Sequence, residues 1–121
     1  MLHKVLTIAG SDSGGGAGIQ GDLKTLTAHG IYATSAITAV TVQNTRGISD
    51  IFPVPEDIVS AQIKSVLEDI GVDAIKTGLL HSAGTIREVA ATMKKHAKGI
   101  PVVVDPVMTA KDGTSLFDLF E

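Results

Sequence analysis

Short apolar runs alternate with helix-like patterns along this chain. The apolar runs are continuous, which is typical of β-strands that are buried on both faces. We expect four such strands, at residues 5–9, 36–42, 74–78 and 101–104. Between the strands, apolar side chains recur every three or four residues, as on one face of an amphipathic helix. The helices are expected at residues 19–30, 56–71 and 82–99.

Residues that favour helix ends support these boundaries. Glu56 and Asp57 would lie in the first turn of the second helix, where acidic side chains interact favourably with the helix dipole. Ser82 is a candidate N-cap of the third helix. Gly30 and Gly71 follow the last apolar positions of the first and second helices, as is common at helix C-termini.

Strands that alternate with helices predict an α/β fold with a parallel central sheet covered by helices. Ligands of such sheets bind at the carboxyl ends of the strands. The segments that follow the expected strands should therefore meet at one edge of the sheet and form the functional site. They are residues 10–18, residues 43–45, residues 77–78 and Asp105.

Composition excludes several classes of protein. The 121 residues are enough for one domain with its own core. They include no cysteine, which rules out disulfide frameworks, thiolate metal sites and cysteine nucleophiles. The net charge of -3 and the aromatic content of 3% argue against a nucleic-acid or anionic membrane surface.

The mean hydropathy of +0.30 requires a search for a membrane span. The longest stretch without a charged residue, Thr25–Thr45, contains too many polar side chains for one. The N-terminal apolar run is too short for a secretory signal, so we expect a cytoplasmic protein.

A sheet of four strands has exposed edges unless something covers them. The apolar tail at residues 116–120 starts a pattern and stops without completing an element. Both features indicate part of a larger fold or a fold completed by a partner, and they make a homo-oligomer a fair expectation.

The glycine-rich segment after the first strand contains the pattern G-x-G-x-x-G at residues 16–21. This pattern suggests dinucleotide binding, yet residues 36–41 contain no acidic side chain to hold a ribose. A Walker A loop is disfavoured because Asp22 and Leu23 stand where it requires Lys and then Ser or Thr. The segment is otherwise a flexible loop, or a loop whose backbone N–H groups approach a ligand. We favour ligand contact.

Three polar residues are candidates for the site. Gln43 offers a donor and an acceptor, which suits a heterocycle with adjacent ring nitrogen and amino group; alternatively it caps backbone. Asp105 either holds Mg²⁺ or is a turn carboxylate. Asp22 either faces the loop or lies on a solvated helix face. The histidines lack metal-ligand spacing and are expected to be structural or solvated; they are His3, His29, His81 and His96.

Five motifs in register resemble the hydroxymethylpyrimidine/phosphomethylpyrimidine kinases of thiamine biosynthesis. They read LTIAGSDSGGGAGIQ (6–20) with DLKT (22–25), ITA (37–39), VQNT (42–45), KTGLL (76–80) and VDPVM (104–108). Lys111 and Gly113 fit the segment that follows. Motifs spread over nearly the whole chain make the resemblance specific.

The resemblance implies a three-layer ribokinase-like fold, of which residues 1–121 would be a single N-terminal portion. Family members transfer the γ-phosphate of Mg-ATP to 4-amino-5-hydroxymethyl-2-methylpyrimidine and then phosphorylate its monophosphate. ATP and Mg²⁺ are thus the implied cofactors, and a small pyrimidine is the implied partner. The implied site has Gln43 on the pyrimidine edge, Gly10, Ala17 and Asp22 in the same pocket, Leu80 and Val107 as apolar walls, and Asp105 toward Mg-ATP.

The chain also departs from the family. Family members are considerably longer, and their second half supplies most of the nucleotide site. It includes a Gly-Thr-Gly segment whose N–H groups stabilise the transferring phosphoryl group. Residues 113–115 read Gly-Thr-Ser and lack the second glycine, so no catalytic residue is assigned. Gly21 and Leu80 replace the alanine and methionine common in the family, and the tail after Gly113 fits poorly.

Two other functions stay open. A non-catalytic pyrimidine-binding module would keep the substrate pocket without the nucleotide half. A dinucleotide-dependent oxidoreductase would instead use the glycine pattern at Gly16, Gly18 and Gly21.

Overall fold

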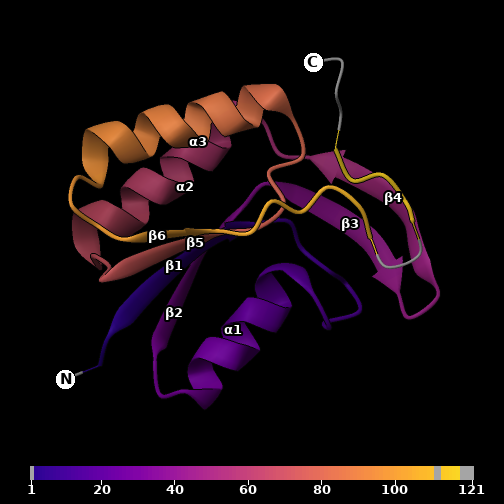
Figure 1. Cartoon of the computed structure of the whole chain (residues 1–121), viewed down its shortest axis with the longest axis horizontal. Helices are drawn as coiled ribbons and strands as arrows, with labels where there is room; N and C mark the ends of the chain where they lie inside the picture. The colour runs from indigo at the N-terminus through magenta and orange to yellow at the C-terminus, as the bar shows by residue number, and fades with distance from the viewer. Residues whose placement is uncertain (1, 111–112, 118–121) are drawn as a thin grey trace.

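The computed structural model describes residues 2–110 and 113–117, and Figure 1 shows how their helices and strands are arranged. The strands are β1 Lys4–Ala9, β2 Tyr32–Ile37, β3 Ala39–Asn44, β4 Gly47–Pro53, β5 Ala74–Thr77 and β6 Val102–Val104. The helices are α1 Gly18–Ala28, α2 Glu56–Asp69 and α3 Ala83–His96. One sheet has the order β2-β1-β5-β6 with parallel neighbours throughout, which confirms the expected α/β fold with a parallel central sheet.

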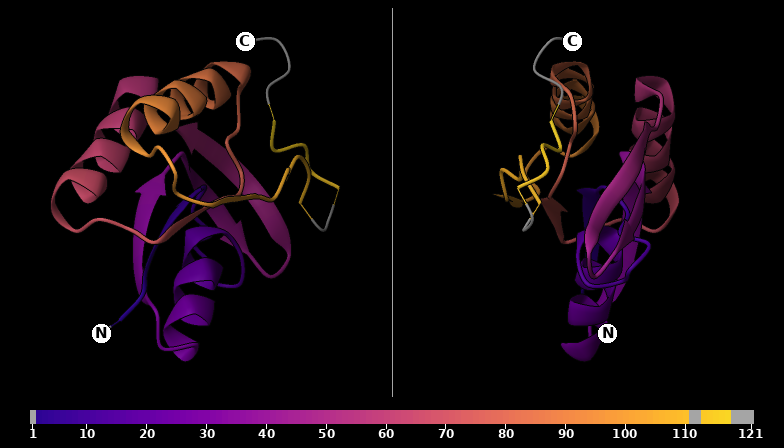
Figure 2. Two further views of the ribbon diagram at one scale, coloured as in Figure 1. Left: turned by 60° about the vertical axis from the view of Figure 1, so that its left-hand side comes forward. Right: turned by 90° about the vertical axis from the view of Figure 1, so that its right-hand side faces the viewer.

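Helices cover the two faces of this sheet (Figure 2). Because alternate residues of a strand point to opposite faces, Leu6 and Ile8 face one layer while Thr7 faces the other. The core between the sheet and α2 and α3 consists of Leu6, Ile8, Ala36, Val59, Ile63, Ile75, Val89 and Ala97. On the other face α1 lies over β1 and β2, and Asp22 of α1 accepts a hydrogen bond from the Thr7 hydroxyl. The described residues therefore form three layers.

The second expected strand, at residues 36–42, is wrong in its boundaries and in its partner. These residues contain the end of β2 and most of β3. The chain leaves the parallel sheet at Thr38, between the two strands. β3 pairs antiparallel with β4, a strand that the sequence pattern did not predict. β4 lacks a continuous apolar run, since Ser49 and Asp50 interrupt it. Gln43 therefore lies in a hairpin and not at the end of a parallel strand.

Strand β6 lies at one edge of the sheet, and its apolar side chains are exposed. Val102, Val103 and Val104 are 40%, 64% and 65% exposed. The expectation that every strand of the sheet is buried on both faces is therefore wrong for β6. The expectation of an exposed sheet edge is confirmed there.

The helix ends agree with the residues expected to form them. Ser82 caps α3, because its hydroxyl accepts the Thr85 N–H at 3.1 Å. Glu56 begins α2. Gly30 and Gly71 follow α1 and α2 with φ of 73° and 71°, a left-handed conformation that glycine adopts without strain. Within the described residues, none of the helices has the length and apolar character needed to cross a membrane.

The described part of the C-terminal tail folds back on itself. Thr109 and Ser115 form an antiparallel bridge, and the Leu116 N–H donates to Met108 O at 2.7 Å. Lys111, which belongs to the resemblance, lies outside the described residues, as do residues 118–121.

Replacing Ile63 with alanine tests the assignment of α2 to the core. Ile63 is fully buried, so Ile63→Ala should lower the free energy of unfolding by about 2–5 kcal/mol through lost contacts and a cavity. Ile58 on the same helix is 49% exposed, and Ile58→Ala should change it by less than about 0.5 kcal/mol. Urea denaturation measures both variants, and equal effects would contradict the assignment.

Asp73 should make stability depend on pH in the acid range. The hydrogen bond from the Lys4 backbone N–H, at 2.8 Å, holds the pKa of Asp73 below its ordinary value of 3.8, and nearby His3 adds to this. A lowered pKa in the folded state contributes stability that is present above the ordinary value and lost as pH falls through the folded value. Asp73→Asn should therefore unfold more easily at pH 7, with the difference vanishing in acid. A difference independent of pH in chemical denaturation would refute this.

Candidate functional site

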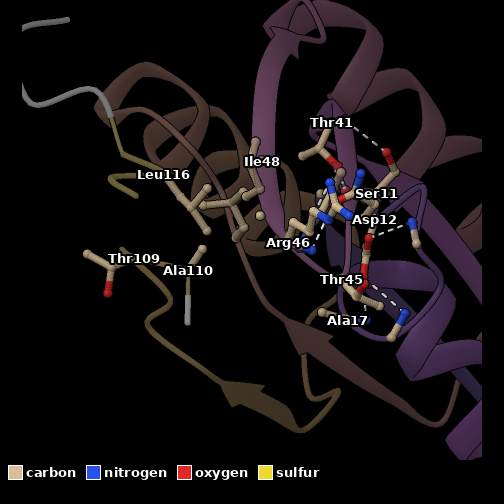
Figure 3. A pocket seen from close by; sticks show the side chains of 18 residues that line it. Ser11, Asp12, Ala17, Thr41, Thr45, Arg46, Ile48, Thr109, Ala110 and Leu116 are labelled. Atoms are coloured by element: carbon tan, nitrogen blue, oxygen red, sulfur yellow. Dashed lines mark hydrogen bonds between the residues drawn. The ribbon is translucent and has the colours of Figure 1, made fainter. Parts of the chain in front are cut away.

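A cavity of about 460 Å³ lies at the carboxyl end of β1. It is lined by most of residues 10–18, called here the glycine loop, by the turn of the β3–β4 hairpin, and by Leu79. The tail residues Thr109, Ala110 and Leu116 face these elements from the other side, as Figure 3 shows. Two of the four segments expected at this edge of the sheet, residues 10–18 and 43–45, thus line the cavity, whereas residues 77–78 and Asp105 do not.

The Asp12 carboxylate organises the glycine loop. Its Oδ1 accepts the Gly14 N–H at 2.7 Å, and its Oδ2 accepts the N–H groups of Gly16 and Ala17 at 3.0 and 2.8 Å. The Gly15 N–H donates to the backbone oxygen of Asp12 at 2.9 Å. Asp12 is only 5% exposed. Four consecutive N–H groups of the loop are therefore already engaged by one residue.

This geometry disfavours the dinucleotide interpretation of the glycine pattern. Dinucleotide and Walker A loops bind phosphate through backbone N–H groups at the start of a helix. Here the N–H groups of Gly16 and Ala17, which begin the pattern, donate to Asp12, and the Ile19 N–H donates to Gly10 O. The glycines instead permit a close approach of loop and strand.

Gly18 joins the loop to α1 and requires its lack of a side chain. It has φ of 58°, and a Cβ atom there would collide with the Gly10 carbonyl oxygen. That oxygen accepts the Ile19 N–H at 2.9 Å, so the first turn of α1 is fastened to the end of β1. This contact fixes the positions of Gly10 and Gly18, which both line the cavity.

Serine and threonine side chains attach the hairpin to the glycine loop. Ser13 Oγ accepts the Gln43 N–H at 2.7 Å and donates to Gln43 O at 2.5 Å. The Thr41 hydroxyl donates to Ser11 O at 2.6 Å, and the Ser11 N–H donates to Ala39 O at 2.8 Å. These bonds attach β3 to residues 11–13 and hold the backbone of Gln43 in place.

The Gln43 side chain lies on the same face of β3 as Thr41 and lines the cavity. The register shift of the hairpin places its extra residue, Ser49, in β4, so the alternation of side chains along β3 is uninterrupted. Gln43 Oε1 lies 3.2 Å from Thr41 Oγ1. Since the single Thr41 hydroxyl proton is engaged mainly by Ser11 O, the Gln43 amide retains donor and acceptor capacity for a ligand.

The structure brings three of the predicted site residues together. Gly10, Ala17 and Gln43 line the cavity from the end of β1, the start of α1 and the hairpin. Among the described lining residues, sequence reasoning missed the role of Asp12 and the contributions of Arg46, Ile48, Leu79 and Leu116. The signal for Asp12 was an aspartate two residues before a glycine run, which is typical of turns closed by the side chain.

Asp22 lies apart from the cavity lining. Its Oδ2 accepts the Thr7 hydroxyl at 2.6 Å and forms an ion pair with Lys76 Nζ at 2.9 Å. Both side chains of the pair are about three-quarters buried, at 22% exposure for Asp22 and 27% for Lys76. This network joins α1 to β1 and β5.

Leu80, Val107 and Asp105 are also outside the lining. Leu80 packs against the core, and its neighbour Leu79 reaches the cavity instead. Asp105 follows β6 and is exposed, with its backbone N–H donating to Thr77 O at 2.9 Å. Among the described residues, no group of three or more His, Asp or Glu side chains could hold a metal ion.

A sequence model described as phosphomethylpyrimidine kinase matches residues 12–120. The chain belongs to this family. The match extends through the tail to residue 120. A hydroxymethylpyrimidine/phosphomethylpyrimidine kinase of Mycobacterium tuberculosis is 53% identical over 113 residues, which cover 93% of this chain and 41% of the relative. The chain thus spans about two-fifths of that relative.

Solved structures agree with the family and confirm the ribokinase-like fold. The phosphomethylpyrimidine kinase of Clostridium difficile has a TM-score of 0.86 and 47% identity, covering 96% of this chain and 50% of that one. The pyridoxal kinase of Staphylococcus aureus, solved with AMP-PCP and pyridoxal, has a TM-score of 0.78 and 41% identity. That match covers 89% of this chain and 40% of the pyridoxal kinase.

Replacing Thr41 with valine tests the attachment of the hairpin. Thr41 is 4% exposed, and Thr41→Val leaves the Ser11 carbonyl without its donor at similar side-chain volume. The free energy of unfolding should fall by about 1–2 kcal/mol. Thr27→Val, on the exposed surface of α1, is the matched control and should have little effect. Equal stability of both variants in urea would show that the bond contributes nothing.

Proposed function

We propose that this chain forms the pyrimidine-binding part of a kinase that phosphorylates 4-amino-5-hydroxymethyl-2-methylpyrimidine and its monophosphate in thiamine biosynthesis. The observation that carries the proposal is the Gln43 amide, which lines a cavity beside a loop whose N–H groups are engaged by Asp12. An amide donates to a ring nitrogen and accepts from an adjacent amino group, which matches the edge of an aminopyrimidine. The names of the related kinases support this substrate class.

The lining of the cavity suits a small neutral ring. Its volume of about 460 Å³ is within the usual range for small-molecule pockets. Ile48, Leu79 and Leu116 supply apolar surface for the faces of the ring. Asp12 is the acidic residue of the described lining, and its carboxylate is directed to the loop N–H groups. The cavity therefore favours hydrogen bonding to a neutral ligand over pairing with a cationic one.

Asp105 is the residue that we assign to Mg-ATP. It lies where β6 ends, at the same edge of the sheet as the cavity, and its exposed side chain is free to meet a ligand from solvent. Magnesium in phosphoryl-transfer sites is commonly held by one or two carboxylates together with phosphate oxygens. ATP would supply the phosphoryl group, in keeping with the AMP-PCP bound to the related pyridoxal kinase.

We further propose that residues 1–121 correspond to the N-terminal portion of the kinase domain. The remaining nucleotide contacts and the donors that stabilise the transferring phosphoryl group would then come from the part of the relatives that this chain does not cover. The pyrimidine contacts that we propose for this chain lie around the cavity of the described residues.

Replacing Gln43 with leucine tests the substrate assignment. Gln43→Leu removes both hydrogen bonds to the pyrimidine edge at similar size, so affinity should fall about 10- to 100-fold in calorimetry. Val42→Leu is the matched control, because Val42 precedes Gln43 on the same strand, is 55% exposed and lies outside the cavity lining. Circular dichroism should show both variants folded. Unchanged affinity of Gln43→Leu would remove Gln43 from the site.

A second candidate function is a pyrimidine-binding module without kinase activity. It is favoured because residues 1–121 include the cavity with Gln43 but no Gly-Thr-Gly segment. ADP release by the purified chain is measured with Mg-ATP and the pyrimidine, against blanks lacking either. Pyrimidine-dependent ADP shows a working kinase and contradicts the second candidate. Pyrimidine binding without ADP, from a folded chain, shows a kinase fragment or a binding module.

A further inference from the structure

The Asp12 carboxylate occupies an unusual place for a buried charge. Three backbone N–H groups donate to its two oxygens, at 2.7 to 3.0 Å. The ion pairs of the described residues are His3–Asp73 and Lys76–Asp22, so none includes Asp12. The nearby Lys24 ammonium donates to the Gly15 carbonyl oxygen at 2.9 Å. The negative charge of Asp12 is therefore stabilised mainly by the dipoles of the loop.

We infer that the Asp12 carboxylate serves as an internal anion of the glycine loop. It holds the loop in the conformation that contacts the ligand, and it prevents phosphate from binding to the same N–H groups. Consecutive N–H groups that converge before a helix form a concave anion site in other proteins. In this chain the carboxylate oxygens of Asp12 take the positions that phosphate oxygens would otherwise take. Asp12 is thus a positioning residue that also determines which ligands the loop accepts.

The chemistry of the loop requires a carboxylate and not an amide at this position. Both oxygens of Asp12 accept, one from Gly14 and the other from Gly16 and Ala17. An asparagine has one accepting oxygen, and its NH₂ group would face N–H donors. The loop would then lose at least one of the bonds that define its shape.

The N–H groups that Asp12 engages are closed to phosphate. On the proposed function, the phosphates of ATP and of a phosphorylated pyrimidine would then bind elsewhere along the cavity. The loop is left to contact the uncharged ring. The same sequence pattern that suggests phosphate binding would thereby exclude it.

Removing the carboxylate should convert the loop into an anion site. We would titrate inorganic phosphate, and separately formate, into ¹⁵N-labelled Asp12→Ala at constant ionic strength and record amide shifts. Saturable shifts are expected at Gly14, Gly16 and Ala17, with affinity at least about tenfold higher than for the wild-type chain. Asp69→Ala is the matched control, since it removes one exposed negative charge far along α2.

Several results would overturn the inference. One is a saturable phosphate-induced shift of these amides in the wild-type chain. Another is equal phosphate binding by Asp69→Ala. A third is that the amides of Asp12→Ala have the same chemical shifts as in the wild-type chain and do not respond to phosphate. Should Asp12→Ala be poorly folded, its Tm is measured in formate and in chloride at equal ionic strength. A higher Tm in formate for this variant alone supports the inference, and equal Tm values contradict it. No pyrimidine is present, so either outcome leaves the proposed substrate to be judged by the Gln43 variants.

Discussion

The hydrogen bonds to Asp12 are the constraint on which the site depends. They shape the glycine loop, and the loop in turn fixes both neighbours of the cavity. On one side Gly18 meets the Gly10 carbonyl and sets the start of α1. On the other, Ser13 holds the hairpin strand that carries Gln43. The glycine loop, which has no large side chain, thus forms one wall of the cavity through its hydrogen-bonded backbone.

Much of the fold could be predicted from the sequence, because burial leaves a pattern. β1, β5, β6 and all three helices were expected close to where they lie, since their apolar residues follow the strand or helix period. The β3–β4 hairpin escaped prediction for the opposite reason. Val40, Val42 and Phe52 expose apolar surface in it, while Asp50 interrupts β4, so neither a continuous nor an alternating pattern is clear.

The candidate site was predicted in part, and its misses have a physical origin. Gly10 and Gln43 could be predicted as site residues because each follows an apolar run of the sequence, where a strand is expected to end. The ion pair of Asp22 with Lys76 joins residues 54 positions apart and has no local signature. Asp12 was passed over because a carboxylate that serves only the backbone next to it leaves no pattern beyond its position before the glycines. These distinctions follow from which interactions are local and which are tertiary.

The central claim is that the cavity beside the glycine loop binds the pyrimidine through Gln43. The most direct measurement is a titration of 4-amino-5-hydroxymethyl-2-methylpyrimidine into the ¹⁵N-labelled chain, followed by amide chemical shifts. The account predicts saturable shifts at the Gln43 side-chain amide and at the backbone amides of Gly10 and Ala17. Saturable shifts that cluster away from the cavity, or no shifts at millimolar pyrimidine, would contradict it.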